Sequence, residues 1–165
     1  MSTTSKAPMT AKPAPNPDVT RASGAKPRRE MPAKYHRAVV NGAMVLGAVL
    51  VAASGTIHLH LWMGGYRNIH IIGPMFLAQA ISAFAIAIAI AVLRWATLAL
   101  VGAALLAGTI GGLLATVWHG VFGFQDSLGA PYAGLSLFME GAGIVVLVSA
   151  AFGRYQLRRG RWQTT

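Results

Sequence analysis

The sequence predicts an all-α integral membrane protein, a four-helix bundle preceded by a disordered basic tail. Three observations lead to this fold class. Of the 165 residues, 55% are hydrophobic and only 11% are charged, which is too apolar for a soluble domain of this length. Four apolar stretches of spanning length follow one another from Ala38 onward. The segment before them contains six of the eight prolines.

Residues 1–34 form the first segment, which we expect to be a disordered cytoplasmic tail. Its prolines, small polar residues and basic residues bury too little apolar surface to offset the entropy of ordering. A targeting helix would also be basic and poor in acids, but six prolines disfavour an amphipathic helix.

A four-transmembrane-helix domain is expected over residues 35–153. Each apolar stretch is about 21 to 24 residues long, and roughly 20 helical residues cross the hydrocarbon core. Pro74 falls in the first turns of the second stretch, where its missing N–H does least harm. A basic C-terminal tail, residues 154–165, follows. The expected spans are 38–61, 70–93, 96–118 and 132–152.

The basic residues predict the orientation of these spans. Eight Lys and Arg residues precede the first span, Arg94 separates the second from the third, and four arginines follow the fourth. Arg67 alone lies in a connection on the other side. Both termini are therefore expected in the cytoplasm, as for a multi-pass protein of the bacterial cytoplasmic membrane. Anionic lipid at that face accounts for the net charge of +10 without nucleic acid.

Small residues at helical spacing predict close packing of the spans. Gly108 and Gly112 form a G-x-x-x-G pattern in the third span. Such patterns let helix backbones approach in lipid. The packing is expected within the chain or between copies of it.

Four histidines are expected on the extracytoplasmic side, and they have two interpretations. With nearby Met63, Met75 and Met139 they form a possible ligand set for copper, zinc or haem iron. Against this, the first two histidines lie about 200° apart on a helix, and the sequence has no H-x-x-x-H or H-E-x-x-H. We favour interfacial histidines with no cofactor. The four residues are His58, His60, His70 and His119.

Glu140 lies near the middle of the fourth span. An acidic group at that depth costs roughly 2.5–3.5 kcal/mol, so it should be protonated or partnered. Gln79 and Thr109 lie at similar depth and are its expected hydrogen-bond partners, with Ser54 a turn or more further out. Glu140 is expected either to link helices through hydrogen bonds or to form a site for a proton, an ion or a quinone headgroup.

The outer connections contain one acid, Asp126, which we expect to pair with Arg67. An exposed pair adds little stability and would mainly set the register of the two loops. The sequence has no cysteine, no G-x-S-x-G, no phosphate-binding glycine loop and no paired acids. Enzyme activity is therefore not expected.

The stretch "HLHLWMGGYRNIHIIGPMF" resembles small four-helix membrane proteins common in high-GC, actinobacterial genomes. Those proteins have a similar His-Leu-His-Leu-Trp stretch, a Gly-Tyr-Arg turn and a glycine before the second helix. The likeness extends over about residues 38 to 152. It implies the same topology, and the family has no assigned activity to carry over.

Two functions of different classes are expected from these features. The favoured one is a non-enzymatic accessory or structural subunit that docks a larger membrane assembly, through another membrane protein or a second copy. The alternative is a small binding or transport module, in which the histidines hold a metal ion or haem and Glu140 handles a proton or cation.

Overall fold

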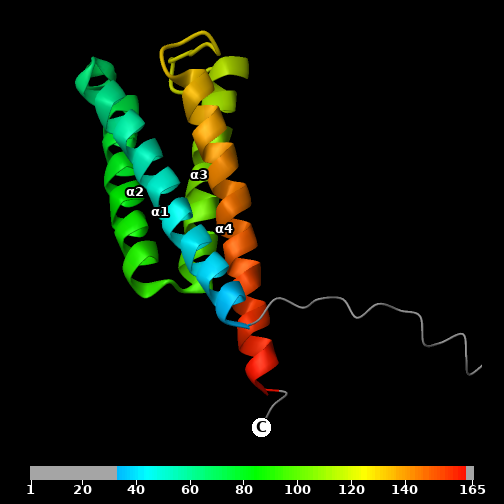
Figure 1. The fold of residues 1–165 in the computed structure, drawn as a ribbon. Helices are drawn as coiled ribbons and strands as arrows, with labels where there is room; N and C mark the ends of the chain where they lie inside the picture. The colour runs from blue at the N-terminus through cyan, green and yellow to red at the C-terminus, as the bar shows by residue number, and fades with distance from the viewer. Residues whose placement is uncertain (1–32, 163–165) are drawn as a thin grey trace, which may run out of the picture. The chain divides into compact units, whose positions relative to one another are not determined.

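The structure, a computed structural model, describes residues 33–162 and contains four long α-helices (Figure 1). All four are long and apolar enough to cross a membrane. This confirms the four helices expected from hydropathy. A short 3-10 helix, η2, lies in the first connection. The helices are α1 (Ala33–Met63), η2 (Tyr66–Asn68), α2 (Ile72–Leu93), α3 (Ala96–Trp118) and α4 (Ala133–Trp162).

The boundaries differ from expectation at both ends of the described chain. The first helix begins at Ala33, so the last residues of the segment 1–34 are helical and the rest of it lies outside the described residues. The fourth helix continues to Trp162, well into the segment 154–165. Both extensions are rich in basic residues, which remain helical beyond the apolar spans.

The helices run alternately up and down (Figure 1). Helix α1 packs along α2 and α4, and α3 packs along α4, whereas α2 and α3 contact each other much less. The α2–α3 connection lies beside α4, where Arg154 Nε donates to the carbonyl of Arg94 at 2.9 Å. The opposite end, with connections 64–71 and 119–132, is called the loop end below.

Small residues bring the helices together in the core. A Cβ added to Gly55 on α1 would lie 2.9 Å from the Cβ of Ala83 on α2. On α4, Gly143 faces the side chain of Leu106 of α3 in the same way. By contrast, a Cβ added to Gly108 or Gly112 would meet nothing within 4 Å. The G-x-x-x-G pattern therefore does not pack against a helix among the described residues.

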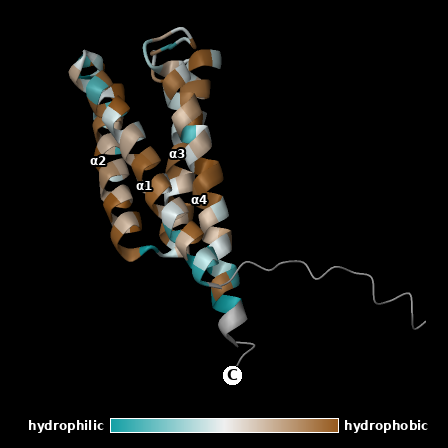
Figure 2. Ribbon diagram, in the orientation of Figure 1, coloured by the Kyte–Doolittle hydropathy of each residue, from teal (hydrophilic) through white to brown (hydrophobic). Residues whose placement is uncertain are grey.

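The outer faces of the helices are apolar, and hydrophilic residues gather towards the helix ends (Figure 2). Large exposed side chains include Ile81 and Ile88 of α2 and Phe138 and Val145 of α4. A lipid-facing surface has this composition, because hydrocarbon accepts apolar side chains without cost and disfavours polar ones.

Backbone geometry shapes the two connections at the loop end. Helix α2 begins at Ile72, two residues later than expected. The residue before it, Ile71, has φ 68° and so cannot be part of the helix. At the second residue of α2, a Cβ added to Gly73 would lie 2.7 Å from the carbonyl oxygen of Arg67. Only glycine lets η2 rest on the start of α2 in this way.

The longer connection contains a two-residue hairpin. Val121 and Phe124 exchange both backbone hydrogen bonds, at 2.8 and 2.9 Å. The central residues Phe122 and Gly123 both have positive φ, as a type I′ turn requires. This turn places Phe124 and the following Asp126 over the loop end of the bundle.

Candidate functional site

The loop end contains a cavity of about 510 Å³ between the four helices and their two connections. Its walls come from both helix pairs, and they include residues of α2 and α3, two helices that contact each other little. Most of the lining side chains are apolar. The small surfaces of Gly108 and Gly112 on α3 form part of the wall, which explains why their expected helix partner is missing.

Glu140 is the polar centre of this cavity. Its side chain is only 1% exposed. Ser54 Oγ on α1 donates to Glu140 Oε1 at 2.8 Å, and Ser136 Oγ, one turn earlier on α4, donates to the same oxygen at 2.9 Å. The described residues give the second oxygen, Oε2, no hydrogen bond. Glu140 therefore offers one free acceptor beside the cavity.

The expected partners of Glu140 line the same cavity but do not bond to it. Thr109 Oγ1 donates instead to the carbonyl of Leu106 in its own helix, at 2.7 Å. Gln79 Nε2 is buried and has no partner among the described residues. The described residues therefore do not form the predicted hydrogen bonds. A Thr hydroxyl readily turns back to its own helix, and the two serines lie closer to the carboxyl group.

Ser136 was not identified from the sequence as a partner of Glu140, although the spacing of the two residues indicates the contact. Serine and glutamate four residues apart lie on one face of a helix and are neighbours there. The spacing of Ser136 and Glu140 therefore predicts the contact. Ser54 was named as a partner a turn or more further out, and it reaches Glu140 directly across the α1–α4 interface.

Of the four histidines, His58 alone lines the cavity. Its Nδ1 lies 2.8 Å from the carbonyl oxygen of Ser54. A carbonyl only accepts, so the Nδ1–H group donates in this contact. The ring packs against Phe76, with centroids 5.2 Å apart.

The other histidines lie elsewhere at the loop end. His60 packs edge-on against Tyr132, and His70 and His119 are exposed. Within residues 33–162, no three His, Cys, Asp or Glu side chains come close enough to hold one metal ion. The structure thus does not assemble the predicted ligand set. The reason is geometric, since residues 58 and 60 point to different sides of α1.

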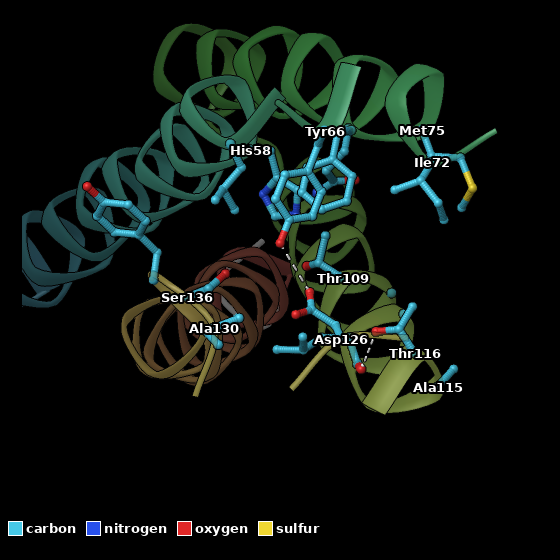
Figure 3. Close-up of a pocket in the computed structure, with 18 of the residues that line it drawn as sticks. His58, Tyr66, Ile72, Met75, Thr109, Ala115, Thr116, Asp126, Ala130 and Ser136 are labelled. Atoms are coloured by element: carbon cyan, nitrogen blue, oxygen red, sulfur yellow. Dashed lines mark hydrogen bonds between the residues drawn. The ribbon is translucent and has the colours of Figure 1, made fainter. Parts of the chain in front are cut away.

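A contact between the two connections covers the cavity. Tyr66 of η2 and Asp126 of the longer connection point towards each other (Figure 3), with Tyr66 Oη 3.5 Å from Asp126 Oδ2. The Tyr66 ring packs against Phe76 and Phe124, at 4.7 and 5.7 Å between centroids. Burial, and secondly the charge of Asp126, raises the pKa of Tyr66 above its ordinary value of 10.0.

The expected ion pair between Arg67 and Asp126 is replaced by this contact. Asp126 accepts from Tyr66 and from the backbone N–H of Ser127, the latter at 2.8 Å. Arg67 is exposed and lines a separate shallow depression instead. Neighbouring residues of a tight turn point in different directions, and it is Tyr66 that faces the bundle.

The charges around the cavity have one sign. The described residues contain two acids, Asp126 and Glu140, and both line it. No Lys or Arg is among the described lining residues. The cavity is therefore the electronegative region of a chain whose net charge is +10.

The comparisons with known proteins return no relative for this chain. No family model, no curated protein and no solved structure matches it. The stretch that carries the actinobacterial resemblance forms the end of α1, the η2 turn and the start of α2, so it builds one wall and part of the cover of the cavity.

Proposed function

We propose that this chain is a multi-pass protein of the bacterial cytoplasmic membrane that binds a small, largely apolar molecule within its helix bundle. The observation that carries the proposal is a buried carboxyl group with one free oxygen in the wall of a 510 Å³ apolar cavity. Binding sites for small molecules combine an apolar lining with a few convergent polar groups.

The polar groups describe the ligand further. Within the described part of the chain, Glu140 Oε2 is a free acceptor when the group is ionised, and Gln79 Nε2 is a buried donor without a partner. A buried donor left unpaired costs about 1–3 kcal/mol. A ligand with its own hydrogen-bonding group would offset that cost, and its apolar body would fill the rest of the cavity.

The positive-inside bias supports an orientation for this site. Arg94 and Arg154 meet at the end opposite the cavity, and thirteen of the fourteen basic residues belong to that side in the sequence. The cavity would then open towards the extracytoplasmic half of the membrane. The basic segments would contact anionic lipid at the cytoplasmic face.

This proposal changes our preference between the two functions expected from the sequence. The cavity favours the binding module, with an organic ligand in place of a metal ion or haem, because one histidine of the four reaches it. An accessory role in a larger assembly stays a prediction. It is compatible with a ligand site inside the bundle, since the outer helix faces remain free for partners.

Filling the cavity from α3 tests the proposal. Gly108→Leu adds a side chain to the cavity wall, and Gly111→Leu adds the same group to an exposed position of α3 outside it. Protein purified from its native membrane should carry a bound small molecule in native mass spectrometry. Gly108→Leu should lose it and Gly111→Leu should keep it. Equal ligand content in both variants, or none in the unmodified protein, would refute the proposal.

A further inference from the structure

We propose that the ligand is a lipophilic organic cation, such as a protonated amine with an apolar body, and that Glu140 is its counter-charge. This inference rests on the proposed function, because it names the chemical class of the molecule in the same cavity. Three features of the site lead to it: the charge of the lining, the state of the buried carboxyl group and the aromatic wall.

The charge of the lining selects a cation over an anion. Both acids of the described chain line the cavity, one at its cover and one at its base. In surroundings of low dielectric constant, two negative groups attract positive charge strongly, and the described lining residues include one histidine, His58, but no Lys or Arg. An anionic ligand would face the same two groups as a repulsion.

Among residues 33–162, the carboxyl group itself has no positively charged hydrogen-bond partner. Its hydrogen bonds come from the neutral hydroxyls of Ser54 and Ser136, and both go to Oε1. A buried charge is costly unless another charge compensates it, and hydroxyl groups compensate it only in part. An ammonium group beside Oε2 would supply the missing charge and a donor together.

Aromatic rings that line the same cavity suit a cation of this kind. The rings of Tyr66, Phe76 and Phe124 line the cavity and pack on one another. An organic cation within about 6 Å of a ring face is attracted by the negative face of the ring, most strongly where water is excluded. A small inorganic ion would instead need several oxygen or nitrogen ligands, and no three His, Cys, Asp or Glu side chains of the described residues come close enough to hold one.

Two compounds with one skeleton separate charge from shape. At neutral pH 3,3-diphenylpropylamine is an ammonium ion, whereas 3,3-diphenyl-1-propanol is neutral and also donates a hydrogen bond. Binding is measured by titration calorimetry on the full chain in an uncharged maltoside detergent. We expect the amine to bind at least about tenfold more tightly than the alcohol, which corresponds to about 1.4 kcal/mol.

Substitution of the carboxyl group then assigns the preference to Glu140. Glu140→Gln keeps an oxygen for both serine hydroxyls but removes the charge, so the two compounds should bind within about twofold of each other. Gly108→Leu should weaken binding of the amine, and Gly111→Leu should leave the binding of the amine unchanged. Circular dichroism and gel filtration check that each variant is folded, and the comparison in the unmodified protein holds even if Glu140→Gln does not fold.

The other outcomes overturn the inference and remain distinguishable. Equal or tighter binding of the alcohol in the unmodified protein would show a site for neutral molecules. The inference of a cationic ligand would then be wrong, and the proposed function would stand. If neither compound binds, the inference of a cationic ligand is also refuted. The proposed function would then depend on the ligand content of the two glycine variants. An amine preference that survives Glu140→Gln would show that the carboxyl group is not the counter-charge.

Discussion

At the scale of single residues, the site is built from one carboxyl group and two serines on neighbouring helices. Ser54 and Ser136 hold Glu140 Oε1 at 2.8 and 2.9 Å, so the orientation of the carboxyl group is fixed before any ligand arrives. The sequence identified Glu140 from its depth in a span. It named Ser54 only as a more distant partner and did not identify Ser136, because hydropathy places a single hydroxyl among apolar residues without saying which side of the helix it faces.

The serine contacts predict how Glu140 responds to substitution. Glu140→Gln should preserve folding, because the amide oxygen still accepts from both hydroxyls. Glu140→Leu leaves the two buried hydroxyls without a partner, which should lower the free energy of unfolding by about 1–3 kcal/mol. Thermal unfolding in detergent measures both. A loss on Glu140→Gln as large as that on Glu140→Leu would contradict these contacts.

Tyr66 predicts a pH dependence at the cover of the cavity. Its raised pKa means that the folded state favours the neutral phenol, so this stabilisation is complete below pH 10.0 and is lost as the pH rises through the higher pKa of the folded protein. The unfolding temperature should therefore fall above that pH. The unfolding temperature of the Tyr66→Phe variant should fall less over the same pH range, because phenylalanine cannot ionise. Identical pH profiles of the two proteins would show that Tyr66 is not held in this way.

At the scale of elements, the third helix shows why a small-residue motif did not predict its own role. Gly108 and Gly112 have the spacing of a helix-packing motif, yet a Cβ on either would meet nothing within 4 Å. A motif gives the face of a helix but not what covers that face. Here α3 packs on α4 through Leu106 and Gly143, which leaves the glycines beside the cavity.

The turn between α1 and α2 makes a prediction at the same scale. Gly73→Ala would place a Cβ about 2.7 Å from the backbone oxygen of Arg67, and this backbone cannot move without displacing η2. We expect a loss of about 1–3 kcal/mol in the free energy of unfolding. Gly134→Ala is the matched control at the start of α4, where a Cβ meets nothing within 4 Å. Equal stability of the two variants would refute the close contact.

At the scale of the whole molecule, apolar length predicted the four helices, and it did so because each span has to satisfy its own backbone. Hydropathy did not predict the conformation of Ile71, which has φ 68°, and α2 therefore begins two residues later than expected. The cavity was beyond the reach of the sequence, since it depends on how far apart α2 and α3 lie. That separation is set by packing of both helices on other partners.

The orientation of the whole chain stays a prediction with a direct measurement. A reporter fused after the last residue should be active only in its cytoplasmic form, and one inserted near Ser127 only in its exported form, because thirteen of the fourteen basic residues flank the helix ends that the positive-inside rule assigns to the cytoplasm. The reverse result would place the cavity in the cytoplasmic half of the membrane.

The most direct measurement of the central claim is an experimental structure of the protein purified from its native membrane with little detergent exchange. The account predicts density for a non-protein molecule in the cavity beside Glu140 Oε2, with Ser54 and Ser136 still bonded to Oε1 and α2 still apart from α3 at the loop end. A closed bundle would contradict it, with α2 packed on Gly108 and Gly112 and with Gln79 bonded to Glu140.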